Sequence, residues 1–271
     1  MTRANELDPT ESVLNFYATD LRRKREASGI NQRTFAKMAL IAPSLLNKIE
    51  SATRLPTKEL SVLADVTFGT GEHFQNLWKL VIRYAYPAWF RPWVELEEEA
   101  AAIRSLQLQL VPGLLQTEEY ARAVFAGARL AVEEQEERVA ARMARQLILQ
   151  RDTPPELWIV LDEYVLRRPV GSSRIMRAQF ERLIEAASVP STVLQILPMS
   201  AGPAGSEGPF TVLTLDEGPG VVYADSFRQG QILTDPSDVK AARRLYDLLM
   251  GLALSPAASI DVIADAMKEL R

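Results

Sequence analysis

Seven side chains between residues 32 and 54 combine hydrogen-bonding groups with positive charge. They are Gln32, Arg33, Ser44, Leu45, Asn47, Lys48 and Arg54. Amide and hydroxyl groups such as those of Asn47 and Ser44 can hydrogen-bond to base edges, a leucine can contact a thymine methyl, and lysine or arginine can hold phosphates. This combination predicts contact with double-stranded DNA.

The elements that would position these side chains are helices. Up to about residue 86, apolar residues recur at spacings of three and four. Together with capping residues, this spacing predicts five helices, over 13–27, 32–39, 43–51, 58–68 and 72–85. Phe35, Ala36, Ile41, Leu46 and Ile49 fall where the second and third of these helices must pack on each other. Two short helices joined by a tight turn can present one of them to the major groove of DNA.

Charge is distributed unevenly along the chain. Residues 20–60 contain nine Lys and Arg against four acidic residues, whereas the whole chain of 271 residues has a net charge of −4. A basic module attached to an acidic remainder is typical of a protein in which one small domain meets a polyanion. Ordinary fluctuation of surface charge is the alternative explanation.

Segments 21–32, 35–36 and 43–50, with Pro56, resemble the helix-turn-helix of repressors of the xenobiotic-response-element type. The resemblance implies a DNA-binding domain in which Gln32 supports backbone and base contacts. It also implies that the polar side chains of the third helix face the groove. A purely structural helical bundle is the alternative.

Three positions depart from the repressor pattern. Leu40 and Ala52 stand where glycine is usual, and Ala42 stands where a serine usually caps the third helix. A non-glycine residue in a left-handed turn costs on the order of 1 kcal/mol, and a lost cap costs a similar amount. We therefore expect these departures to affect stability, affinity or target rather than to remove DNA binding.

A second region of the chain begins after the prolines at 87 and 92. Residues 94–150 have helical periodicity, and short β-branched segments then predict strands at 157–161, 192–197, 210–215 and 221–224. The last two strands should form a hairpin, a helix over 173–187 should connect the first two, and Asp235 and Ser255 should begin two final helices.

The expected fold is mainly α with an α+β C-terminal part. A five-helix helix-turn-helix domain would occupy residues 1–86. A C-terminal sensor, partner-binding and dimerisation domain would occupy 87–271, with a helical linker region over 94–150 and a small four-stranded sheet with helices over 156–271.

The C-terminal part also resembles a known group. Segments 111–124, 137–149, 157–171 and 193–198 are similar to the C-terminal domain of actinobacterial antitoxin-like regulators. The resemblance implies a transcriptional regulator whose C-terminal domain senses a small partner protein, commonly encoded beside it, or another signal. The loop 200–210 lacks a histidine that is often present in relatives, so no role of that histidine is carried over.

Seven C-terminal residues are candidates for binding a partner or ligand. They are Asp162, Glu163, Arg167, Phe210, Tyr223, Phe227 and Gln231. The charged members follow a predicted strand, where sites often form, and the aromatic members with Gln231 could line a face or groove for a peptide or small molecule. A solvated, salt-linked loop and ordinary hairpin core are the alternatives.

The composition excludes several kinds of chemistry. Cysteine is absent and His73 is the one histidine, which rules out disulfides, thiolate metal sites and cysteine nucleophiles. The glycines of loop 200–210 do not form a phosphate loop, and Ser206 lacks the surroundings of a hydrolase nucleophile. We expect no catalytic site, cofactor or metal. The chain shows no signal peptide and no apolar run of the roughly 20 residues that span a bilayer, so we expect a cytoplasmic protein with no membrane partner.

These observations predict a sequence-specific DNA-binding regulator. A homodimer is expected, because two-fold operators need paired recognition helices. Two alternatives stay open. One is an antitoxin-like module that chiefly sequesters a small partner, and the other is a small-ligand sensor.

Overall fold

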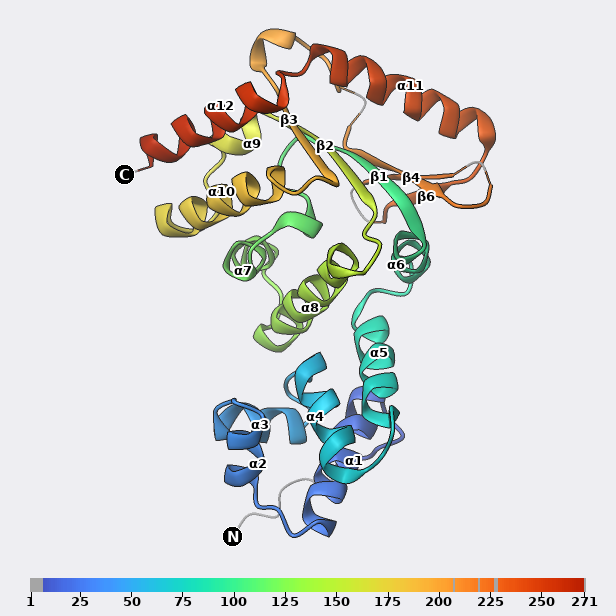
Figure 1. Ribbon diagram of the computed structural model, residues 1–271, viewed down its shortest axis with the longest axis vertical. Coiled ribbons are helices and arrows are strands. Elements are labelled where there is room, and N and C mark those ends of the chain that lie inside the picture. Colours follow the sequence, from blue (N-terminus) through green and yellow to red (C-terminus); the bar gives the residue numbers. More distant parts are fainter. Residues whose placement is uncertain (1–6, 207, 219, 227–228, 271) are drawn as a thin grey trace. The chain divides into compact units, whose positions relative to one another are not determined.

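The computed structural model describes residues 7–206, 208–218, 220–226 and 229–270 (Figure 1). The chain divides into two compact units. The N-terminal unit contains the residues up to Pro87 and the segment Leu130–Ala141, and the sheet unit contains Ala88–Arg129 and Arg142–Arg271. The chain therefore passes between the units three times. The predicted fold class, helical first and α+β afterwards, is confirmed.

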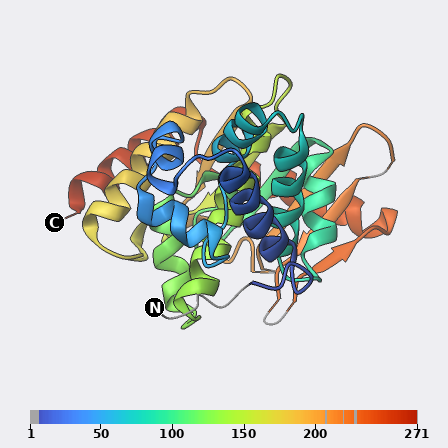
Figure 2. The ribbon, with the colours of Figure 1, turned by 90° about the horizontal axis from the view of Figure 1, so that it is seen from below.

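The N-terminal unit is built from helices that gather around one core (Figure 2). They are α1 (Val13–Ala27), α2 (Gln32–Met38), α3 (Pro43–Glu50), α4 (Lys58–Phe68) and α5 (His73–Ala85). Ser12, Asn31 and Thr57 cap α1, α2 and α4, because each side chain accepts a backbone N–H from the first turn. All five predicted helices are confirmed, with bounds within one residue of those expected.

Large side chains from four of these helices form the core of the N-terminal unit. Tyr17, Phe35, Leu46 and Phe74 are fully buried, and the rings of Tyr17 and Phe74 meet edge to face at 5.5 Å. Asp65 closes the core beside α5. Burial raises the pKa of its carboxyl, but hydrogen bonds from Thr70 and from the α5 amides outweigh burial, and the pKa of Asp65 is lowered. The inner side of α3, which carries Leu46, therefore packs against the buried core of the N-terminal unit.

The sheet unit contains a six-stranded mixed sheet in the order β3-β2-β1-β4-β5-β6. Its strands are β1 (Ala100–Gln107), β2 (Glu156–Asp162), β3 (Thr192–Leu197), β4 (Phe210–Leu215), β5 (Val221–Ala224) and β6 (Gln231–Leu233). The strands β1, β2 and β3 are parallel, and β4, β5 and β6 continue the sheet in antiparallel pairs. The predicted hairpin of β4 and β5 is confirmed.

Helices cover both faces of this sheet. The helices that follow α5 in the chain are α6 (Arg91–Glu98), α7 (Glu118–Gly127), α8 (Val132–Arg145), α9 (Tyr164–Arg167), α10 (Ser173–Ala187), α11 (Pro236–Leu252) and α12 (Pro256–Glu269), with short 3-10 turns at Gly113–Leu115, Gln146–Gln150 and Met199–Ala201. Most of α8 belongs to the N-terminal unit. One face packs on α10 and α12 through Phe180 and Ile263, and the other packs on α11 through Tyr246 and Leu249 (Figure 1).

In the described part of the chain, no single helix is long and apolar enough to cross a membrane. Helices α11 and α12 meet the length and hydropathy criteria only when taken together, and they are bent by 70° relative to each other.

Two expectations about the sheet are wrong. The sheet has six strands instead of four, because β1 lies inside the stretch 94–150 that was expected to be helical and β6 was not predicted. Strand β1 begins with three alanines and has one β-branched residue, Ile103, so its local preference is helical. It becomes a strand because β2 and β4 both pair with it, which is a case of tertiary context overriding propensity.

Candidate nucleic-acid interface

Helix α3 divides its residues between core and solvent as the DNA-binding prediction requires. Leu46 and Ile49 are fully buried, whereas Ser44, Asn47 and Lys48 are exposed. The polar groups that were expected to meet base edges therefore lie on one open side of the helix. Leu45 is half-buried and packs against the core of the unit, so only part of its side chain faces outward.

A buried ion pair fixes the end of α3 against α1. Arg25 donates to both carboxylate oxygens of Glu50, with N···O distances of 2.6 Å and 2.9 Å, and donates a third hydrogen bond to the carbonyl of Ile30 at 2.8 Å. Both side chains are almost completely buried, and the bonds to Glu50 raise the pKa of Arg25. A two-pronged charged pair of this kind specifies orientation as well as attraction.

Gln32 hydrogen-bonds both to the buried Glu50 carboxylate and to an exposed side chain of α3. Its side-chain amide donates to Glu50 at 2.8 Å and to the side-chain oxygen of Asn47 at 3.4 Å. The first residue of α2 and a predicted base-reading residue of α3 are thereby connected through the buried carboxylate. The structure thus brings together two of the residues predicted to contact DNA, Gln32 and Asn47.

Two of the four acids of residues 20–60, Asp20 and Glu50, are buried, whereas several of the cations of this segment are exposed. Asp20 is buried and accepts from Arg23 at 2.5 Å, with His73 Nε2 at 2.7 Å. Arg33, Lys37 and Lys48 are exposed, and within the described residues no carboxylate pairs with them. Exposed cations without a carboxylate partner favour contact with phosphates.

Arg54 lies in a different setting from the other predicted cations. Its guanidinium forms an ion pair with Glu136 of α8, within the segment Leu130–Ala141 that belongs to the N-terminal unit. The same segment contacts the core through Ala140 and accepts a hydrogen bond from the Tyr86 hydroxyl at the carbonyl of Ala141. A phosphate at Arg54 would compete with this carboxylate for the guanidinium.

The three departures from the repressor pattern have the geometry expected of them. Leu40 and Ala52 both adopt left-handed backbone conformations, with φ of 54° and 55°. Ala42 is the N-cap of α3 and provides no side-chain acceptor. Each left-handed residue costs on the order of 1 kcal/mol relative to glycine, yet α3 keeps its position because the buried contacts beneath it are complete.

The charged C-terminal candidates separate into two places. Asp162 lines a cavity at the end of β2, whereas Glu163 and Arg167 form an ion pair at 3.0 Å on the side of α9 that faces α12. Glu163 also accepts the backbone N–H of Met199 at 3.1 Å, and this bond lowers the pKa of Glu163. Sequence reasoning grouped three residues that the structure assigns to two surfaces.

The aromatic C-terminal candidates do not form one groove. Phe210 packs in the core under α11, and Tyr223 packs in the core on the opposite face of the sheet, where it meets Phe90 and Trp93. Gln231 is exposed on the edge strand β6, and Phe227 lies outside the described residues. The groove prediction for Phe210 and Tyr223 is wrong because alternate residues of paired strands point to opposite faces.

Sequence reasoning missed the residues that hold this interface and those that line the cavity. Arg25 and Glu50 are 25 positions apart, so only their opposite charge and helical register could have signalled the pair. Gln109, Tyr164 and Arg168 join Asp162 at the cavity because strand pairing places their loops together. The described residues hold no group of three or more His, Asp or Glu side chains that could bind a metal ion.

Comparison with known families agrees with both halves of this description. Residues 21–71 match a helix-turn-helix family, which confirms the predicted domain of xenobiotic-response-element type. Residues 90–265 match a family described as a domain of unknown function (DUF5753). No curated protein and no solved structure matches the chain. Because the second match covers well over half of the sequence, the chain belongs to the DUF5753 family and carries a helix-turn-helix domain at its N-terminal end.

Proposed function

We propose that this protein is a sequence-specific DNA-binding transcriptional regulator that reads the major groove with α3. The observation that carries the proposal is the exposed set Ser44, Asn47 and Lys48 on a helix fixed by the buried Arg25–Glu50 pair. Base edges would be read by Asn47 and Ser44, and phosphates would be held by the surrounding cations. The proposal contains no catalytic step or cofactor, and it places the protein in the cytoplasm at the nucleoid.

We further propose that the protein acts as a homodimer and that the sheet unit receives the signal. Two-fold operators need two recognition helices about one helical turn of DNA apart, which one copy of α3 cannot provide. The similarity of segments 111–124 and 157–171 to regulators encoded beside a small protein supports a protein partner for the sheet unit. Sequestration of that partner, with DNA binding secondary, is the corresponding alternative.

The test is selection of bound sequences from random DNA by the purified full chain, followed by gel retardation on the selected site. Asn47→Ala with Lys48→Ala should weaken specific binding by on the order of 10²-fold, since each good base contact contributes about 1–3 kcal/mol. Lys79→Ala is the matched control, because Lys79 is exposed on α5 of the same unit, a helix that packs on α1 and α4.

Equal retardation by the double variant and the parent protein would refute the assignment of α3 as the reading helix. Genome-wide footprinting with and without the adjacent gene then separates the two roles of the sheet unit. Footprints that change when the neighbour is deleted support a regulator that responds to a partner. Unchanged footprints argue against that partner.

A further inference from the structure

A cavity of about 360 Å³ lies at the carboxyl ends of the parallel strands of the sheet unit. Leu108 and Gln109 reach it from the end of β1, and Asp162, Tyr164 and Arg168 reach it from the end of β2. The loop 203–206, between β3 and β4, forms the opposite wall. Three successive connections of the sheet therefore contribute to one site.

The topology of the sheet explains why a cavity forms here. The chain adds β2 and β3 on one side of β1 and then returns to place β4 on the other side. In open sheets, the crevice outside the carboxyl ends of the strands at such a reversal is where ligands bind. Ala204 of the returning loop and Leu108 pack against the same core cluster as Leu106 of β1, and this packing supports the wall.

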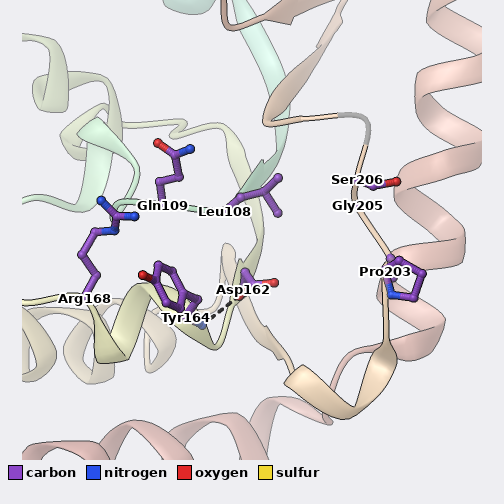
Figure 3. A pocket seen from close by; sticks show the side chains of 9 residues that line it. Leu108, Gln109, Asp162, Tyr164, Arg168, Pro203, Gly205 and Ser206 are labelled. Carbon is purple, nitrogen blue, oxygen red and sulfur yellow. Dashed lines mark hydrogen bonds between the residues drawn. The ribbon is translucent and has the colours of Figure 1, made fainter.

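The groups facing the cavity include a cation without a counter-ion. Arg168 has no carboxylate partner among the described residues, in contrast to Arg167, which pairs with Glu163. The Arg168 guanidinium lies 5.1 Å from the centroid of the Tyr164 ring, and 48% of Tyr164 is exposed. Figure 3 shows Arg168 and Gln109 on one side of the cavity, the loop with Pro203 and Gly205 on the other, and Tyr164 and Leu108 between them.

Hydrogen bonds hold both walls in place before any ligand binds. Asp162 accepts the backbone N–H of Tyr164 at 2.8 Å, which fixes the start of α9. Glu163 accepts the backbone N–H of Met199 at 3.1 Å and so ties α9 to the turn that leads into the loop 203–206. A site with fixed walls loses less entropy when it takes up a small molecule.

We infer that this cavity binds a small organic anion, a planar ring that bears a carboxylate or a phosphate. The anionic group would pair with the guanidinium of Arg168, whose planar fork matches both oxyanions. The ring would lie between Tyr164 and Leu108, and the amide of Gln109 would hydrogen-bond to its polar edge. The volume is within the range of about 300–1,000 Å³ that is usual for small-molecule sites. The inference does not depend on DNA binding.

The experiment measures binding of two anion and neutral pairs to the full-length protein. The pairs are 4-hydroxybenzoate with 4-hydroxybenzamide, and adenosine monophosphate with adenosine. The ring signal of Tyr164, assigned by comparison with Tyr164→Phe, reports occupancy by NMR. We expect saturable binding of at least one anion, at least tenfold tighter than its neutral partner. Arg168→Ala should weaken this binding at least tenfold. Arg174→Ala should not change it, because Arg174 is an exposed arginine of α10 paired with Glu119.

The two pairs distinguish the sources of the anion. If only 4-hydroxybenzoate binds, the anionic group of the ligand is a carboxylate. If only adenosine monophosphate binds, that group is a phosphate. Equal affinity for an anion and its neutral partner overturns the inference, as does an affinity that Arg168→Ala leaves unchanged. The inference is also overturned if the NMR signal of the Tyr164 ring does not shift with either anion at about 5 mM, a concentration that would detect even millimolar dissociation constants.

Discussion

The two units differ in how the charged residues near their helices are partnered. Beside α3 in the N-terminal unit, the acid Glu50 is buried and paired with Arg25, and Arg33 and Lys48 are exposed without a carboxylate partner in the region that the structure describes. On α7 and α10 of the sheet unit, Arg122 pairs with Glu118 and Arg174 with Glu119 at the surface. Exposed cations without an acidic partner attract a polyanion more strongly than cations that are paired.

This difference shows that net charge is a poor guide to the binding surface. The whole chain is acidic, with a net charge of −4, yet the acid nearest the reading face, Glu50, is buried beneath α3 and bound to Arg25. A buried acid that is already paired subtracts little from the field that DNA meets. The charge that the surface presents depends on which charged side chains have an oppositely charged partner. The following predictions test how the charged and strained residues around α3 affect stability and DNA binding.

Breaking the inward pairing should have the largest effect. Arg25→Ala leaves the Glu50 carboxylate buried without its partner, and we expect the free energy of unfolding of the N-terminal unit to fall by about 3–5 kcal/mol. Arg22→Ala is the control, because the exposed Arg22–Glu26 pair is worth about 0.5 kcal/mol or less. Urea denaturation followed by circular dichroism measures both. Equal losses for the two variants would show that the buried pair does not support α3.

Relieving the strained turn should have a smaller effect of opposite sign. Leu40 is 93% exposed and left-handed, so Leu40→Gly gives up little packing and removes backbone strain. We expect a gain of roughly 0.5–1 kcal/mol in the free energy of unfolding, after the greater freedom of glycine in the unfolded chain is allowed for. Leu40→Ala keeps the strain and should give no gain. A similar gain from alanine would point to the exposed apolar surface of Leu40 instead of its backbone.

Releasing Arg54 should have the smallest effect. Glu136→Gln removes the carboxylate that pairs with Arg54, and we expect specific DNA binding to become about 2–3-fold tighter at low salt, since such a partly buried ion pair is worth about 1 kcal/mol and competes with a phosphate for Arg54. Glu134→Gln makes the same change in net charge but affects Arg138 instead. Titration by fluorescence anisotropy compares them. The same gain from both variants would mean that overall charge, and not Arg54, is responsible.

The predictability of the fold follows from how local its signals are. Each N-terminal helix is specified by its own apolar spacing and its own cap, such as Asn31 for α2 and Thr57 for α4, so the sequence predicted their bounds. Strand β1 lacks a local signal because its alanine-rich start favours a helix, and it is held as a strand by pairing with β2, more than fifty positions away. The strand count was therefore wrong while the hairpin of β4 and β5, which is local, was right.

The candidate sites divide in the same way. Ser44, Asn47 and Lys48 belong to one helix, and helical periodicity alone places them on the exposed side. The cavity needs Gln109 beside Arg168, and nothing near either residue in the sequence reveals the parallel pairing of β1 and β2 that brings them together. Tyr223 and Phe210 show the same limit, because only the register of the sheet shows that they face opposite cores.

The chain passes between the two units three times, and this affects how the domains of such a protein can be exchanged during evolution. Domains joined end to end can be exchanged by a single break in the gene. Here, a break near Pro87 would give the segment Leu130–Ala141 unfamiliar neighbours, because that segment folds with the helices that precede it. Exchange of the first 87 residues alone would lose the contacts that this segment makes with them, such as the Arg54–Glu136 ion pair, so the N-terminal helices are not a cassette that can be moved without the segment.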